Sequence, residues 1–445
     1  MKIAIELLIF FACIFIGARL GGIALGTVAG IGLAIFVFVF ALPPGGPPPG
    51  VLGMIIAVIT ALAAMQAAGG LDYLVSLAER IMRRHPQYIV FIAPVATYLL
   101  VLGSGTTHVI YALLPVIAEV ARKGGVRPER PLSISVIAGF HGNIASPISA
   151  ATVAMLGLMT AQGISLPRML MITIPSTFIA VLIGALSVAW RGRNLSEDPE
   201  YQRRLATGEV KSADEQPPPE GRNLRNARGS MILFLIAIAA VVLIGIFPDL
   251  RPTYQIVGDG GIDTDQVSMG MAIMIVMIAV AGLIMILFRA SPEATIKGTI
   301  MRSGITAIIS ILGISWLGSS FFEGNRLIIV SSISSLVKVY PLAFAAGMFL
   351  LSTMLFSQAA TVSLLMPVGQ ALGVPTYLLL AFYPASNGLF FVPTYGTILA
   401  AVSFDQTGTT KIGKYLLNHS FMRPGLVSML SAVMLALLLS KILLG

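Results

Sequence analysis

Charged residues are scarce in this chain. Lys, Arg, Asp and Glu make up 11% of its 445 residues, whereas 56% are hydrophobic. The charged share is about half that of an ordinary soluble domain, so the composition predicts a polytopic membrane protein. Cysteine is nearly absent too, and the lone Cys13 excludes both a disulfide framework within the monomer and a cysteine-built metal site.

Acidic residues are fewer than basic ones, and the formal net charge is +9. Such an excess of basic residues is compatible with binding to a nucleic acid or to anionic lipid. The positions of the basic residues along the chain distinguish these two kinds of partner. The N-terminal residues also resemble a secretory signal that begins at Lys2. Glu6 and the absence of an Ala-x-Ala-like cleavage site favour a retained first span instead.

Eight apolar runs are long enough to cross about 30 Å of hydrocarbon. They lie near 3–18, 22–41, 51–68, 168–190, 231–247, 268–288, 304–321 and 424–443. Four further apolar stretches, at about 88–121, 131–159, 340–371 and 375–404, are interrupted by polar residues, glycine or proline. Each half of the first stretch has only about 15 residues, too few to cross alone. We therefore expect re-entrant hairpins at 88–121 and 340–371 and discontinuous helices at 131–159 and 375–404.

The two pairs of interrupted stretches indicate an internal repeat. Tyr88 corresponds to Tyr340, the sequence Leu-Leu-Pro ending at Pro115 to Leu-Met-Pro ending at Pro367, and Gly125 to Gly373. Residues 1–190 form the first predicted repeat and 231–445 the second. The segment between them, 191–230, is rich in Arg, Glu, Pro and Asn and is predicted to be a solvated linker.

The basic residues predict how the repeats are oriented. With the N-terminus outside, hairpins that return and broken helices that cross, the inside loops and the linker hold nearly all of the 28 basic residues. The exceptions are Lys2, Arg168, Arg251, Arg326, Lys338 and Lys441. This asymmetry follows the positive-inside rule and makes the two repeats inverted.

Inverted repeats with discontinuous helices are typical of secondary transporters, whose substrate sites lie near the bilayer midplane. A helix broken in hydrocarbon leaves unpaired backbone groups, tolerable only where they are buried in protein or line a cavity. Its N-terminal end attracts carboxylates, and Ser, Thr and Asn add short donors there. The alternative is that the hydroxyls bond back to their own helices and the glycines only allow close packing.

Two histidines and one arginine have open roles. His108 is either a donor to the anion, a proton-coupling group or a polar residue satisfied within the bundle. His141 has no counterpart in the second repeat, so a structural role fits it at least as well. Arg127 lies beside the exit of the first hairpin, where it either faces lipid headgroups or steers dianions inward. The segment 69–86 reads as an interfacial amphipathic helix, with 323–341 as its partner.

Several segments together resemble the anaerobic C4-dicarboxylate carriers of the Dcu type. They are GARLGGIALGTVAGIGLAIFVFVF, QAAGGLD, GTTHVIYALLPVI, RPERP and IASPIS, and the resemblance covers the whole length. It implies an all-α polytopic transporter of the ion transporter superfamily in the bacterial inner membrane, with the predicted topology placing both termini in the periplasm. It implies exchange of fumarate, malate, aspartate and succinate, a homodimer and no cofactor.

The superfamily resemblance also implies which residues hold the carboxylates. With His108 added, they are Ser104, Gly105, Thr106, Thr107, His108, Asn143, Ser146, Ser357, Gln358, Thr361, Asn387, Thr394 and Thr397. No nucleic-acid partner, metal site or catalytic residue is predicted. Exchange is favoured over coupling to Na⁺ or H⁺, because no obligatory acidic relay stands out in the spans. A symporter of another di- or tricarboxylate, an anion channel and an intramembrane hydrolase are the alternatives.

Overall fold

The computed structural model describes residues 2–445 except 21, 47–48, 209, 211–223, 259–260, 394 and 413–417. In the first half, the helices are α1 (Lys2–Leu20), α2 (Ala24–Ala34, continued by a π turn to Val39), α3 (Pro49–Ala67), α4 (Gly70–Arg84), α5 (Ile89–Ser104), α6 (Ile110–Lys123), α7 (Glu129–Ala145), α8 (Ala150–Thr160) and α9 (Leu166–Val188).

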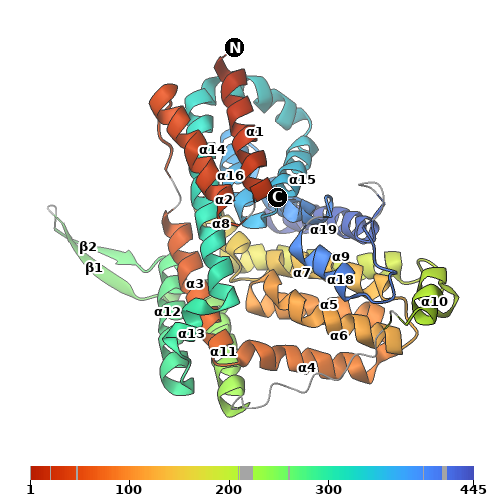
Figure 1. The fold of residues 1–445 in the computed structure, drawn as a ribbon. Coiled ribbons are helices and arrows are strands. Elements are labelled where there is room, and N and C mark those ends of the chain that lie inside the picture. The colour runs from red at the N-terminus through yellow and green to blue at the C-terminus, as the bar shows by residue number, and fades with distance from the viewer. Residues whose placement is uncertain are drawn as a thin grey trace.

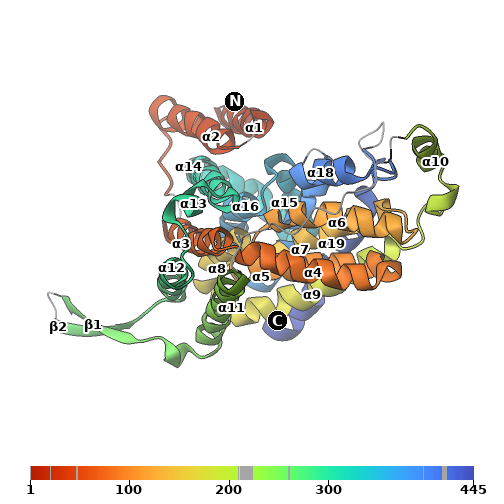
Figure 2. The ribbon, with the colours of Figure 1, turned by 60° about the horizontal axis from the view of Figure 1, so that its bottom comes forward.

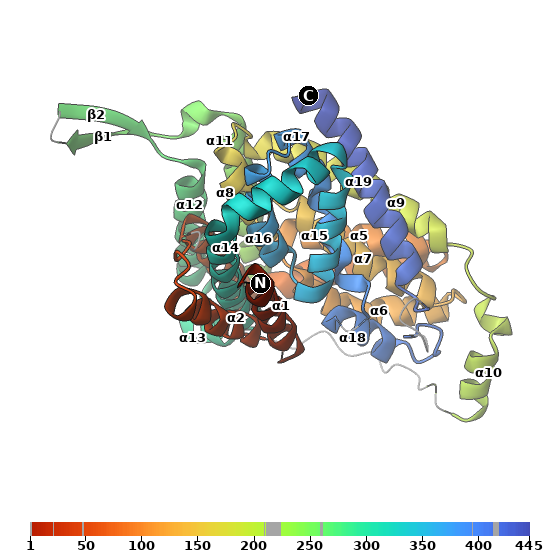
Figure 3. The same cartoon turned by 90° about the horizontal axis from the view of Figure 1, so that it is seen from above.

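The remaining helices follow the predicted linker or lie within it. They are α10 (Pro199–Ala206), α11 (Leu224–Ile246), α12 (Met269–Phe288), α13 (Pro292–Lys297), α14 (Thr299–Val339), α15 (Leu342–Leu355), α16 (Gln358–Ala371), α17 (Thr376–Phe382, continued by 3-10 turns over Tyr383–Phe390), α18 (Gly396–Phe404) and α19 (Met422–Leu444). Two strands, β1 (Thr253–Gly258) and β2 (Gly261–Gln266), pair antiparallel. This β-hairpin was not predicted, and it lies at the opposite end of the molecule from α10 (Figures 2 and 3).

The all-α membrane architecture is confirmed. Among the described residues, seven helical segments are long and apolar enough to cross a bilayer. The pair Leu52–Ala67 and Gly70–Arg84, bent by 71°, would make an eighth. The predicted run 304–321 and most of the predicted amphipathic partner 323–341 belong to one 41-residue helix, α14, which ends at Val339.

Both predicted hairpins consist of two helical arms joined by a short tip. Each second arm ends in the same way, because Gly125 (φ 69°) and Gly373 (φ 76°), two residues after the last helical residue, adopt the left-handed conformation. One expectation was wrong: the first arm, Pro86–Ser104, has 19 residues and is long enough by itself to cross. A preceding 3-10 turn, Pro86–Tyr88, lengthens this arm beyond the apolar count.

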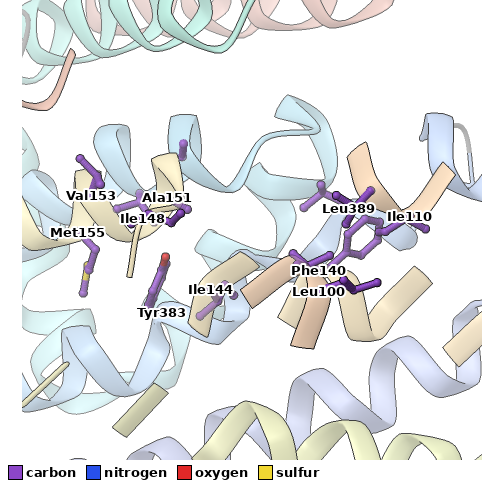
Figure 4. Packing of buried hydrophobic residues seen from close by; sticks show 14 of the residues in the cluster. Leu100, Ile110, Phe140, Ile144, Ile148, Ala151, Val153, Met155, Tyr383 and Leu389 are labelled. Carbon is purple, nitrogen blue, oxygen red and sulfur yellow. The ribbon is translucent and has the colours of Figure 1, made fainter. Parts of the chain in front are cut away.

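The helices form two groups that lie side by side (Figure 1). In one, α3 packs against α12 and α14, and α2 also packs against α14; in the other, α5 packs against α7, and α9 against α19. The two halves of the chain interdigitate, because α8 packs against α16 and α7 against the 3-10 turns after α17. Buried side chains of α7 and α8, such as Ile144 and Met155, therefore share one core with Tyr383 and Leu389 (Figure 4).

The contact between α5 and α7 depends on a glycine. A Cβ atom on Gly142 would lie 2.7 Å from the carbonyl oxygen of Tyr98 and 3.2 Å from Cβ of Val101. Tyr98 itself is fixed, because its buried hydroxyl donates to the carbonyl oxygen of Ile174 at 3.1 Å and pairs with Thr177 on α9 at 2.9 Å. The backbones of α5 and α7 approach each other as small residues allow in membrane helix pairs.

We expect Gly142→Ala to lower the free energy of unfolding by about 1–3 kcal/mol, because the added methyl group forces the two backbones apart. Gly282→Ala on α12 is the matched control, since no atom lies within 4 Å of its Cβ position. Thermal unfolding of the purified protein in detergent measures both. Equal Tm values for the two variants would contradict the close-packing argument.

Candidate functional site

The two hairpin tips share one backbone geometry. In each, a left-handed residue ends the first arm, Gly105 (φ 66°) in one and Phe356 (φ 49°) in the other. An extended residue with a hydroxyl group follows and caps the second arm. The Thr106 hydroxyl accepts from the His108 backbone N–H at 3.3 Å, and Ser357 accepts from Ala360 at 3.2 Å. Glycine adopts the left-handed conformation at no steric cost, whereas the backbone of Phe356 is strained in that conformation.

The two interrupted helices break at the predicted places. Helix α7 ends at Ala145, and α8 begins at Ala150 after Ser149, whose hydroxyl accepts from the Thr152 N–H at 3.1 Å. In the second half, helical turns end at Phe390 and α18 begins at Gly396 after the extended Tyr395. Each break starts a new helix, whose first turn has N–H groups without partners in the helix.

These N-terminal ends converge on one cavity of about 550 Å³. Its lining includes the tip before α6 (Gly105–His108) and the first residues of α8, α16 and α18, together with Asn143. The opposite wall comes from α3 and α14 and is mainly apolar, with the small polar residues Thr306 and Ser310. Within the described residues, the lining contains no Lys, Arg, Asp or Glu.

Behind the cavity, four polar side chains form a continuous hydrogen-bonded chain. Asn143 Nδ2 donates to Gln358 Oε1 at 2.6 Å. Gln358 Nε2 donates to the Phe140 carbonyl oxygen at 2.9 Å and to Oδ1 of Asn387. Asn387 Nδ2 lies 3.0 Å from Nδ1 of the fully buried His141. The chain joins α7 of the first half to α16 and the turns after α17 in the second.

A profile of the anaerobic C4-dicarboxylate membrane transporter family matches residues 2–444. DcuB of Escherichia coli O157:H7, an anaerobic C4-dicarboxylate transporter, is 41% identical over 440 residues, 96% of each chain. DcuA of Wolinella succinogenes, a C4-dicarboxylate transporter, is 40% identical over 439 residues, 99% of each chain. The chain belongs to this transporter family. It is therefore a membrane transporter and not an enzyme.

Two solved transporters share the fold of this family member at low sequence identity. The YdaH transporter of Alcanivorax borkumensis has a TM-score of 0.58 and 18% identity, covering 88% of this chain and 85% of its own. MtrF of Neisseria gonorrhoeae has a TM-score of 0.58 and 14% identity, covering 91% and 83%.

The cavity of this C4-dicarboxylate transporter family member brings together seven of the thirteen predicted site residues. They are Gly105, Thr106, Thr107, His108, Asn143, Ser357 and Gln358. His108 lies in the first tip, where its Nδ1 is 2.9 Å from the Thr106 hydroxyl. That contact fixes the ring beside the cavity.

Five predicted residues are buried behind the lining. Ser104, Ser146, Thr361, Asn387 and Thr397 are each at most 1% exposed. Thr361 donates to the Ser357 carbonyl oxygen at 2.7 Å, as the alternative of local back-bonding predicts, whereas Ser104 donates forward to the carbonyl oxygen of Thr106 in the tip at 3.4 Å. Asn387 belongs to the amide chain instead. Thr394 lies outside the described residues.

Sequence reasoning missed Tyr395, which lines the cavity between the predicted Thr394 and Thr397. Its ring stacks on Phe356 at 6.3 Å and meets Phe140 edge-on at 5.3 Å, so it bridges the second tip and α7. Its hydroxyl group interacts with Thr107 of the first tip. The sequence could have indicated Tyr395 by its position, because it directly precedes the helix that follows the predicted break.

Arg127, for which the sequence left open lipid headgroups or the steering of dianions, is buried in ion pairs. Its guanidinium is 8% exposed and pairs with Glu129 at 2.7 Å and with Asp198 of the linker. We call these three side chains the Arg127 clasp. Glu129 also accepts from the Ser420 hydroxyl at 2.8 Å. With both carboxylates ionised, Arg127, Glu129 and Asp198 together carry a net negative charge, so this group does not attract a dianion. Burial alone raises the pKa of the Asp198 carboxyl, but hydrogen bonds from the Tyr201 N–H and from Arg127 outweigh it and lower that pKa.

We expect Asp198→Ala to destabilise the transporter by about 2 kcal/mol, because it removes a charge-assisted hydrogen bond from a buried guanidinium. The exposed Glu197→Ala is the control. Because the pKa of Asp198 is lower when folded, its contribution is present above the unfolded pKa of about 3.9 and is lost only in acid. The difference in Tm between the two variants should thus be equal at about pH 6 and pH 8. A difference that vanishes at pH 6 would contradict the clasp.

Proposed function

We propose that this family member exchanges C4-dicarboxylates across the bacterial inner membrane, taking up fumarate or aspartate and releasing succinate, with the cavity as the binding site. The observation that supports this most is the convergence of interior helix N-termini from both halves on a cavity whose described lining carries no charged side chain. We further propose that the protein acts as a homodimer, that its two halves are inverted repeats and that both termini are periplasmic.

The cavity suits a dianion that must also be released. A helix N-terminus carries about half a positive charge and free N–H donors, so it attracts a carboxylate without a buried cation. The first tip and α8 belong to one half, and α16 and α18 to the other. We propose that each half holds one of the two carboxylates, with the hydroxyl groups of Thr106, Thr107 and Ser357 as further donors.

Exchange requires no coupling ion in this arrangement. A loaded carrier returns with the second dicarboxylate, so one dicarboxylate replaces another in the site, and for fumarate and succinate the two anions carry the same charge. Among the described residues, no group of three His, Cys, Asp or Glu side chains forms a metal-like cluster. We propose exchange without a cofactor, and Na⁺ or H⁺ coupling is an outcome that the transport experiment distinguishes.

We expect proteoliposomes loaded with labelled succinate to release it when fumarate, aspartate or unlabelled succinate is added outside, because an exchanger returns only with bound substrate. Without external dicarboxylate the label should stay inside, and citrate should not replace the dicarboxylates. Release that needs a Na⁺ or pH gradient would indicate symport. Lack of stimulation by any dicarboxylate would overturn the exchange proposal.

We expect Thr107→Val to raise KM for exchange about ten-fold or more, because it removes a donor to an ionised carboxylate without changing volume. Thr306→Val is the matched control on the opposite wall. The Thr306 hydroxyl also lines the cavity but donates to its own helix, to the Arg302 carbonyl oxygen at 3.0 Å. Initial rates at several substrate concentrations separate the two, and equal KM changes would contradict the assignment of the first tip.

A further inference from the structure

One backbone carbonyl group decides the orientation of the Gln358 amide. The Phe140 carbonyl oxygen can only accept a hydrogen bond, and it lies 2.9 Å from Nε2 of Gln358. With the opposite orientation, Gln358 Oε1 would face the carbonyl oxygens of both Phe140 and Asn387. The Gln358 amide nitrogen therefore points toward Phe140, and its oxygen Oε1 points toward Asn143.

That orientation propagates in both directions along the chain. Because Gln358 Nε2 donates to Asn387 Oδ1, the Asn387 amide nitrogen faces His141 and donates to its Nδ1. His141 thus acts as an acceptor at Nδ1, and its ring is a neutral Nε2–H tautomer. A buried acceptor at this end keeps Asn387 from turning over, so His141 is a positioning residue.

At the other end, Gln358 Oε1 must receive a donor, and Asn143 supplies it through Nδ2 at 2.6 Å. The amide nitrogen of Asn143 is thereby committed to the chain. Asn143 is half-buried and lines the cavity, and its Oδ1 accepts no hydrogen bond from the described part of the chain. A carbonyl oxygen, an acceptor, is the atom that Asn143 has left for a ligand.

We propose that the Asn143 carbonyl oxygen is the recognition point for a hydrogen-bond donor on C2 of the substrate, so that the cavity distinguishes 2-hydroxy- and 2-amino-dicarboxylates from unsubstituted ones. The inference rests on the proposed function and deepens it. A carboxylate oxygen is an acceptor and gains nothing from this atom, whereas a hydroxyl or ammonium group does. The donors of the tips and helix N-termini hold the two carboxylates, and Asn143 reads the carbon next to one of them.

The wild-type protein provides the first test, in proteoliposomes loaded with labelled succinate. L-Malate and methylsuccinate are similar in size, but only L-malate carries a donor at C2. We expect L-malate to half-saturate succinate release at a concentration about five-fold lower than methylsuccinate, the effect of one hydrogen bond. Equal half-saturating concentrations would overturn the role of Asn143.

The second test uses Asn143→Ala, which removes the acceptor. We expect the ratio between methylsuccinate and L-malate to fall to about one, while succinate and fumarate are affected less than L-malate and L-aspartate. Thr107→Val is the matched control, because the loss of a carboxylate donor should weaken all four substrates by the same factor and leave the ratio unchanged.

The outcomes separate this inference from the proposed function. If Asn143→Ala weakens all dicarboxylates equally, as Thr107→Val should, the C2 assignment is wrong while the exchange function stands. If wild-type protein shows no release with any dicarboxylate, the proposed function itself fails. Should Asn143→Ala not give folded protein in size-exclusion chromatography, the wild-type comparison of L-malate with methylsuccinate decides alone.

Discussion

The structure depends on one constraint: a helix that ends in an apolar interior must find partners for its unpaired N–H groups. In hydrocarbon, each backbone N–H or C=O group without a partner costs roughly several kcal/mol. Helix ends therefore occur in the apolar interior only where protein or a polar cavity supplies partners for these groups. Here the ends occur in matched places, after the tips at Gly105 and Phe356 and after the breaks before α8 and α18. Thr106, Ser149 and Ser357 each satisfy one backbone donor by capping. The first residues of α8, α16 and α18 line one cavity, and in the proposed function the donors left over at these helix ends bind the anion.

The same constraint ties the two halves of the chain together. Gln358 stands at the N-terminus of α16, yet its amide bonds to Phe140 and Asn143 on α7 and to Asn387 after α17. Buried polar networks of this kind are stable only when their members are satisfied. A displacement of either half would leave several buried amide groups without partners. These hydrogen bonds link the tip of the second hairpin to α7 and to the turns after α17.

Sequence reasoning located the interruptions well and the individual contacts less well. Glycine, proline and hydroxyl residues inside apolar runs mark helix ends by local chemistry, so both hairpins and both breaks were predictable within a few residues. Which side chains face the cavity is decided by helix rotation and tertiary packing, which local composition does not encode. Thr361 and Tyr395 illustrate the difference, since the first bonds back to its own helix while the second lines the cavity. The ion pair of Arg127 was not predicted, because its partner Asp198 lies 71 residues further along the chain, inside a segment predicted to be solvated.

The position of the charges completes the argument about turnover. Charges that the protein buries are paired away from the cavity. Arg127 pairs with Glu129 and Asp198, and Glu6 lies 3.9 Å from the Lys2 ammonium group and accepts a hydrogen bond from Asn325 at 2.6 Å. A full positive charge at about 4 Å from a carboxylate would contribute roughly 4 kcal/mol at an effective dielectric constant of about 20, and a helix end about half of that. Two carboxylates bound by full positive charges would dissociate slowly. Each additional 1.4 kcal/mol or so of binding free energy makes Kd about ten-fold smaller, and the dissociation rate falls with it. For the proposed exchange, in which substrate must be surrendered on either side of the membrane, helix ends and hydroxyl groups are the better-matched donors.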